Sequence, residues 1–366
     1  MGLSVGIVGL PNVGKSTIFN ALTNASVASE NYAFCTIEPN HGIVNVPDQR
    51  IKTINSYIET EKIIYNTIEF VDIAGLVQGA SKGEGLGNKF LSHIRDVSAI
   101  IHVLRCFENE NITHVDGAVN PIRDIETINT ELILKDIETV EKRIQSVSKL
   151  AKGGDKNAKK ELDLMESILE ALNNGKMIYQ MDLDEDQMKE IKSFSLLTSK
   201  SMIFVANISE EDLLNTDNNE HVKSLDEYCR NNKQSLIILS GAIEMEISSM
   251  PEDEQEEFLE TYNLKESSLN KMISEAYKTL NLETFFTAGP KEIRAWPIIK
   301  GATAPEAAGV IHTDFQRGFI RAETYNINDL IQFENEQEIK NAGKLRQEGK
   351  DYIVNDGDII FFKFNV

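Results

Sequence analysis

The chain has 366 residues, of which 41 % are hydrophobic and 26 % are charged, and its formal net charge is −21 at pH 7. The composition is ordinary for a globular protein. The negative charge argues against a nucleic-acid-binding protein whose whole surface is basic, although it allows a local basic patch. The length predicts two or three domains. No apolar run approaches a transmembrane helix, and we expect no signal peptide and no membrane partner. Three scattered cysteines fit neither a metal site nor a disulfide framework, which favours a reducing, cytoplasmic location.

A glycine-rich turn joins the first expected strand, residues 3–8, to an expected helix. It reads Gly9-Leu10-Pro11-Asn12-Val13-Gly14-Lys15-Ser16-Thr17. This order of strand, glycine-rich turn and helix, with a Lys-Ser pair, predicts a phosphate-binding P-loop. We expect Lys15 to reach the β- and γ-phosphates as a catalytic residue and Ser16 to ligate Mg²⁺. The expected nucleotide-binding residues of the turn are Asn12, Val13, Gly14, Lys15, Ser16 and Thr17.

Two further motifs predict contacts to the metal and to the γ-phosphate. Thr36 lies between the P-loop helix and the second expected strand, where P-loop switch proteins place another Mg²⁺ ligand. An ordinary loop threonine is the alternative. The next expected strand, residues 67–71, leads into Asp72-Ile73-Ala74-Gly75, an Asp-x-x-Gly signature. We expect Asp72 to hold the outer shell of the Mg²⁺ and the Gly75 N–H to sense the γ-phosphate.

The residue after this signature departs from the usual GTPase pattern. Many GTPases have a water-positioning Gln there, whereas this chain has Leu76. The chain is therefore either a slow hydrolase or takes a polar group from elsewhere. The candidate for this polar group is His114, in the loop after the expected strand 99–104. We expect His114 to move towards the nucleotide when the glycine-rich residues 79–87 become ordered. The alternative is an ordinary surface histidine. His102, within that strand, is interpreted as a core residue with hydrogen-bond partners.

Residues 121–198 predict a helical insertion. Apolar residues recur at intervals of four and three in an expected helix at 121–150, and a matching stripe follows a turn at 152–156. The two stripes are Ile133, Ile137, Val140, Ile144, Val147 and Leu162, Met165, Leu169, Leu172. They predict an antiparallel helical hairpin. The tip of the hairpin is basic, with Lys149, Lys152, Lys156, Lys159 and Lys160. Two interpretations stay open: the lysines contact RNA, or they are simply solvated, which we favour.

The expected strand 202–206 ends in Asn207-Ile208-Ser209-Glu210, where GTPases carry Asn-Lys-x-Asp. The Asp of that motif accepts hydrogen bonds from N1–H and the 2-amino group of guanine, and adenine has neither donor. Ile208 and Glu210 therefore weaken the case for guanine, although a Glu is still able to reach a donor. The expected strand 235–239 leads into a second loop beside the base. The expected base pocket comprises Asn207, Ile208, Glu210, Ser240, Gly241 and Ala242.

The motifs GLPNVGKST, FCTIEPN, DIAGLVQGASKGEGLGNKFL, NISE and SGA occur in this order around the helical insertion. Segments between Phe285 and Arg321, and the final residues 356–362, look like a TGS domain. The whole chain resembles the Obg-like ATPase family (the YchF group) of P-loop proteins related to translation factors. Leu76 and Glu210 are features of that family.

The resemblance implies an α/β chain with a P-loop NTPase (G-domain) fold at residues 1–280. A coiled-coil helical hairpin at 121–198 interrupts that domain, and a C-terminal TGS domain with a β-grasp fold occupies 281–364. The resemblance also implies a preference for ATP over GTP, slow hydrolysis, and association with the ribosome.

We interpret the chain as a monomeric, Mg²⁺-dependent ATP-hydrolysing switch that binds the ribosome or ribosomal RNA and modulates translation or a stress response. Asn12 resembles the Asn of potassium-activated relatives, so K⁺ is an expected activator. Two alternatives stay open. One is a GTPase of the same fold, which Ile208 and Glu210 disfavour. The other is a nucleotide-gated RNA- or ribosome-binding module with incidental hydrolysis, which the sequence does not discriminate.

Overall fold

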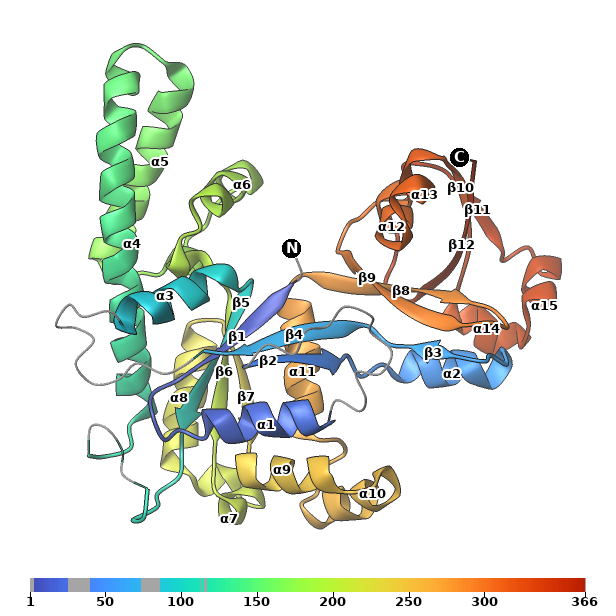
Figure 1. Ribbon diagram of the computed structural model, residues 1–366, viewed down its shortest axis with the longest axis horizontal. Helices are drawn as coiled ribbons and strands as arrows, with labels where there is room; N and C mark the ends of the chain where they lie inside the picture. Colours follow the sequence, from blue (N-terminus) through green and yellow to red (C-terminus); the bar gives the residue numbers. More distant parts are fainter. Residues whose placement is uncertain (1–2, 26–39, 74–85, 113, 115–116, 366) are drawn as a thin grey trace. The chain divides into compact units, whose positions relative to one another are not determined.

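The computed structural model describes residues 3–25, 40–73, 86–112, 114 and 117–365 (Figure 1). The chain divides into two compact units. Unit 1 comprises Met1–Ile43 and Glu69–Met272, and unit 2 comprises Val44–Ile68 and Ile273–Val366. Each unit is built around its own β-sheet.

The sheet of unit 1 has the strand order β2-β4-β1-β5-β6-β7. The strands are β1 (Ser4–Val8), β2 (His41–Asn45), β4 (Thr67–Asp72), β5 (Ala99–Arg105), β6 (Met202–Asn207) and β7 (Ser235–Leu239). The successive pairs β4–β1, β1–β5, β5–β6 and β6–β7 are parallel. Every residue of β1, β5 and β6 is buried, as expected for parallel strands covered on both faces. Their carboxyl ends share one edge, where α/β proteins bind ligands.

His102 lies within β5 and is completely buried. Neither ring nitrogen has a hydrogen-bond partner, so the expectation that it has such partners is wrong. An apolar neighbour, Phe204 on β6, has its ring centroid 5.7 Å away. Burial lowers the pKa of His102 to about 3, so the ring is neutral at physiological pH.

Helices cover both faces of this sheet, whereas α5 (Lys156–Asn173) and α6 (Glu185–Phe194) stand away from it (Figure 1). The other helices of unit 1 are α1 (Lys15–Ala25), α3 (Leu86–Asp96), α4 (Pro121–Lys152), α7 (Glu210–Leu213), α8 (Glu220–Asn231), α9 (Gly241–Ser249), α10 (Glu252–Thr261) and α11 (Ser268–Thr279), which continues into unit 2. Short 3₁₀ helices are η3 (Ile178–Gln180), η4 (Leu197–Ser199) and η5 (Thr216–Asn218). None of the described helices combines the length and apolarity needed to cross a bilayer.

The predicted helical hairpin is confirmed as α4 and α5, which pack against each other. α4 begins at Pro121, where the Asn120 side chain accepts a hydrogen bond from Arg123 N, and ends before Gly153. Asp155 caps α5 by accepting hydrogen bonds from Asn157 N and Ala158 N. Residues of both predicted stripes form the shared core of the hairpin, among them Val140, Met165 and Leu172. All five tip lysines are exposed.

A buried carboxylate joins the hairpin to the segment that leads into β6. Asp136 of α4 accepts hydrogen bonds from Leu197 N at 3.0 Å and from both Thr198 N and Thr198 Oγ1 at 2.7 Å. Burial raises the pKa of Asp136, and these three donors act in the opposite direction. A lost acceptor would leave buried donors unpaired, so Asp136 holds η4 against α4.

The sheet of unit 2 has the order β11-β10-β12-β8-β9-β3. Its strands are β3 (Ile63–Ile64), β8 (Leu282–Ala288), β9 (Ile293–Ile299), β10 (Phe319–Asn326), β11 (Arg346–Glu348) and β12 (Asp358–Phe364), and its helices are α2 (Gln49–Tyr57), α12 (Ala304–Ile311), α13 (Thr313–Arg317), α14 (Ile327–Phe333) and α15 (Glu336–Asn341). β12 runs parallel to β8 between antiparallel pairs, and α12 packs on β9 and β10. This mixed sheet confirms the predicted β-grasp fold.

Residues 44–68 belong to unit 2, although the sequence placed them in the nucleotide-binding domain. Ile51 and Ile54 of α2 are completely buried in one cluster with Phe286 of β8. β3 adds a parallel strand to β9. The burial of these apolar side chains assigns the segment to the C-terminal sheet.

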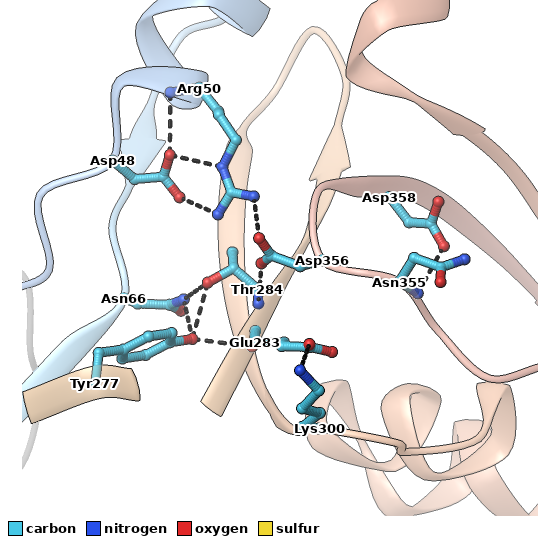
Figure 2. Close-up of polar contacts among 10 residues, drawn as sticks. All are labelled: Asp48, Arg50, Asn66, Tyr277, Glu283, Thr284, Lys300, Asn355, Asp356 and Asp358. Atoms are coloured by element: carbon cyan, nitrogen blue, oxygen red, sulfur yellow. Dashed lines mark hydrogen bonds and ion pairs between the residues drawn. The ribbon is translucent and has the colours of Figure 1, made fainter. Parts of the chain in front are cut away.

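A polar network holds this segment within unit 2 (Figure 2). The Arg50 guanidinium donates two hydrogen bonds to the Asp48 carboxylate, at 2.9 and 2.8 Å, and a third to Asp356 Oδ2 at 2.7 Å. Asp356 Oδ1 accepts from Thr284 N at 2.8 Å. Asn66 Nδ2 donates to Thr284 Oγ1 at 2.9 Å and lies 3.0 Å from the Tyr277 hydroxyl. The network therefore links three separate stretches of the chain.

Candidate nucleotide-binding site

The P-loop lies between β1 and α1, and its backbone depends on glycine. Gly14 has φ +91°, and a Cβ there would lie 2.0 Å from Asn207 Nδ2. A Cβ on Gly9 would lie 2.7 Å from the Val103 carbonyl oxygen of β5. Asn12 has φ 65°, in the left-handed region that Asn tolerates. A loop this close to its neighbours, at the start of a helix, fits a phosphate cradle.

Lys15 and Asp72 meet at this edge of the sheet. Lys15 Nζ donates a hydrogen bond to Asp72 Oδ1 and forms an ion pair with it. The two side chains are only 11 % and 13 % exposed. Register explains the meeting, because Asp72 on β4 lies beside Ile7 on β1, just before the P-loop. The structure thus brings together the residues predicted for the phosphates and for the metal shell.

The chemistry of the predicted metal ligands fits Mg²⁺. The Ser16 hydroxyl and the Asp72 carboxylate are hard oxygen ligands, and Mg²⁺ in NTPases is held by few protein ligands together with phosphate oxygens. Within the described part of the chain, no cluster of three or more His, Cys, Asp or Glu side chains could hold a metal alone. The predicted ligand Thr36 and the predicted γ-phosphate sensor Gly75 lie outside the described residues.

Asn207 bridges the P-loop and the loop after β7. Its side chain, 5 % exposed, donates from Nδ2 to the Val13 carbonyl at 2.8 Å and accepts at Oδ1 from Gly241 N at 2.9 Å. Both ends of the amide contact backbone. Asn207 therefore links the P-loop to the loop after β7, two of the predicted nucleotide-binding loops.

The other predicted base-pocket residues gather at the ends of β6 and β7. Ile208 is 2 % exposed and donates its N–H to the Leu239 carbonyl at 2.9 Å. Ser240 is also buried, and Gly241 begins α9, with Ala242 exposed beside it. The position that carries Lys in GTPases is thus a buried apolar side chain.

Glu210 begins α7, and its carboxylate contacts a residue that the sequence did not single out. The Tyr262 hydroxyl donates to Glu210 Oε1 at 2.7 Å. This hydrogen bond raises the pKa of Tyr262 to about 12. Tyr262 follows the acidic helix α10, and nothing in that run marks it as a partner of a residue 52 positions earlier.

His114 is 4 % exposed, which excludes the surface-histidine alternative. Its Nε2 lies 3.1 Å from Oδ2 of Asp124, a fully buried residue in the first turn of α4. His114 and Arg105 line a cavity of about 480 Å³. The buried Arg105 guanidinium donates to the carbonyls of Phe107 and Ile112, at 3.0 and 2.9 Å, and so shapes this loop.

Comparisons with known proteins agree with this geometry. Residues 4–143 match a family described as "50S ribosome-binding GTPase". Residues 282–365 match the C-terminal family of YchF GTPases, described as "Protein of unknown function (DUF933)". The chain is 53 % identical to the "Ribosome-binding ATPase YchF" of Pasteurella multocida and 52 % identical to that of Bacillus subtilis, in both cases over the full length of both proteins.

A solved structure of similar fold is that of the Schizosaccharomyces pombe YchF GTPase, with a TM-score of 0.90 and 38 % identity. The match covers 99 % of this chain and 98 % of that one. The P-loop, the helical hairpin and the C-terminal sheet are therefore parts of one shared architecture, and the chain belongs to the YchF family.

Proposed function

We propose that this chain is a Mg²⁺-dependent ATPase that acts as a nucleotide-operated switch on the ribosome. The observation that carries the proposal is the meeting of Lys15 and Asp72 beneath a P-loop whose two glycines admit no side chain. The curated relatives, half identical over their full length, are named ribosome-binding ATPases. A role on the ribosome implies a cytoplasmic location for this activity.

Each residue of the site has a distinct task in this proposal. Lys15 leaves Asp72 to bind the β- and γ-phosphates, and Ser16 contributes its hydroxyl to the metal. When bound, Mg²⁺ neutralises charge that develops on the phosphate oxygens. Asp72 orients the outer metal shell, and Thr36 and Gly75 respond to the γ-phosphate. Release of these two residues after hydrolysis resets the switch.

We assign the polar catalytic group to His114, in place of the Gln that Leu76 replaces. In the described structure His114 is paired with Asp124. Hydrolysis on this proposal requires the imidazole to leave that pair and orient the attacking water. On this proposal, the need for this movement makes basal hydrolysis slow.

The preference for ATP rests on the base pocket. Guanine recognition needs a carboxylate turned to its N1–H and 2-amino donors, with a Lys stem alongside the base. Here the Lys position holds the buried Ile208, and Glu210 is hydrogen-bonded to Tyr262. A GTPase is the second candidate, because the solved neighbour and the N-terminal family both carry that word in their names.

The sequence alone favoured solvation of the exposed lysines at the hairpin tip, but the curated relatives are named ribosome-binding ATPases. We therefore propose these tip lysines as the surface that contacts ribosomal RNA. Their positive charge stands out in a chain of net charge −21, and contacts to phosphate need only such charge. Ribosome binding should then weaken steeply as salt rises.

Titration of the pure protein with labelled ATP and GTP, with and without ribosomes, tests the proposal. We expect tighter binding of ATP and hydrolysis that ribosomes accelerate. The variant Glu210→Asp, alone and with Ile208→Lys, should shift the preference towards GTP. The single variant is needed because Ile208→Lys places an ammonium group in a buried position. Tighter GTP binding by the unaltered protein would support the GTPase instead, and binding without hydrolysis in either condition would support a nucleotide-gated binding module.

A further inference from the structure

Glu210 is held by an element that no nucleotide motif includes. Its Oε1 accepts a hydrogen bond of 2.7 Å from the hydroxyl of Tyr262, the residue that directly follows α10. The Tyr262 ring packs beside Phe258, with a centroid distance of 5.4 Å. The hydroxyl therefore comes from a ring that has a packing partner of its own.

The backbone that carries Glu210 is also fixed in place. Ser209 caps α7 by accepting a hydrogen bond from Asp212 N at 3.2 Å. Asn219 ties this turn to β5, because its Nδ2 donates to Asp212 Oδ2 at 3.0 Å and to the Cys106 carbonyl at 2.7 Å. Three residues before Glu210, Asn207 contacts the P-loop. These contacts fix the position of the backbone from which the Glu210 side chain extends, beside the proposed base pocket.

The hydrogen-bonding chemistry of the Glu210 carboxylate explains how Tyr262 affects the recognition of guanine. A carboxylate reads guanine by accepting from N1–H and from the 2-amino group with its two oxygens. Tyr262 occupies Oε1 and offers a hydroxyl donor that remains protonated at neutral pH. The carboxylate keeps lone pairs for other donors, but this hydrogen bond sets its direction. To turn both oxygens towards the two guanine donors, Glu210 would have to give up the hydrogen bond from Tyr262, which costs free energy.

We propose that Tyr262 is a specificity-determining positioning residue, which holds the Glu210 carboxylate away from guanine and so favours ATP over GTP. This inference rests on the proposed ATP-binding function. On this inference, a residue outside the nucleotide-binding motifs helps to select adenine over guanine.

The variant Tyr262→Phe tests the inference, because it removes only the hydroxyl. Competition binding with ATP and GTP should show GTP affinity raised by about fivefold, the value of one hydrogen bond near 1 kcal/mol, with ATP affinity within about twofold of its original value. Adding Glu210→Gln should abolish the gain, since an amide offers one acceptor oxygen in place of two. Tyr228→Phe removes a hydroxyl elsewhere in unit 1 and should leave the ratio of the two affinities unchanged.

The outcomes separate this inference from the function on which it rests. If the unaltered protein binds ATP more tightly than GTP and Tyr262→Phe leaves the ratio unchanged, the role of Tyr262 is wrong and the ATPase proposal stands. A gain that persists in the Tyr262→Phe, Glu210→Gln double variant also overturns it. If the unaltered protein prefers GTP or binds neither nucleotide, both proposals fail. Thermal melting of each variant shows whether the fold is retained, since a purely structural role would lower both affinities together.

Discussion

Lys15 of the P-loop is hydrogen-bonded to Asp72, the last residue of β4. The ammonium group and the carboxylate neutralise each other where the phosphates and the metal are proposed to bind. Nucleotide with Mg²⁺ offers each of them a new partner of opposite charge. The pair therefore keeps two nearly buried charges compensated until the nucleotide enters.

Lys15→Ala and Ser16→Ala should each lower the rate of ATP hydrolysis by about 100-fold or more, because each removes stabilisation of charge on the transferring phosphoryl group. Folding should be retained. Steady-state phosphate release and far-ultraviolet circular dichroism measure the two quantities. Lys271→Ala, at an exposed position of α11, is the matched control with unchanged turnover. Normal turnover in both P-loop variants would refute the site.

Potassium should accelerate hydrolysis relative to sodium at matched ionic strength. The prediction rests on the resemblance of Asn12 to the Asn of potassium-activated relatives, whose side-chain carbonyl helps to hold a cation that supplies positive charge beside the phosphates. Because Asn12 has φ 65°, Asn12→Gly should keep the loop conformation while removing the carbonyl. We expect that variant to hydrolyse ATP at equal rates in both salts. Equal rates in the unaltered protein would rule out the cation.

The stability of unit 1 should fall in mild acid because of His102. Its pKa is about 3 in the folded protein, against an ordinary value of 6.5 when unfolded. Below pH 6.5 the unfolded chain binds a proton that the folded chain does not, so stability is lost as pH falls from 6.5 towards 3. The loss between pH 7 and pH 5 should be about 2 kcal/mol. Urea denaturation of the unaltered protein and of His102→Leu, at both pH values, measures it. The variant should lack this part of the pH dependence, and parallel pH dependences would contradict the prediction.

Arg50→Lys should destabilise unit 2 by about 1–2 kcal/mol, because a lysine cannot reproduce the fork that binds Asp48 and Asp356 together. Trp296, the single tryptophan of the chain, lies on β9 and reports unfolding of this unit by its fluorescence. Arg317→Lys, at a side chain that is 82 % exposed, is the control and should change stability little. Equal midpoints for the two variants would show that the network adds no stability.

Several features could be predicted from sequence because each depends on residues close together in the chain. The P-loop needs a strand, two glycines and a helix start within a short stretch, and its strand and helix are present as β1 and α1. The hairpin follows from apolar periodicity, and its predicted start at Pro121 is confirmed.

The remaining features depend on partners that are distant in sequence. Residues 44–68 join the C-terminal sheet because α2 buries its apolar face against β8. His114 is enclosed by the first turn of a helix, His102 lies in an apolar layer without a partner, and Glu210 meets Tyr262. The sequence by itself determined the phosphate-binding chemistry, since backbone conformation and adjacent side chains create it. Only the tertiary structure decided which groups surround His114, the proposed catalytic histidine, and the proposed base pocket, because packing between distant segments sets those contacts.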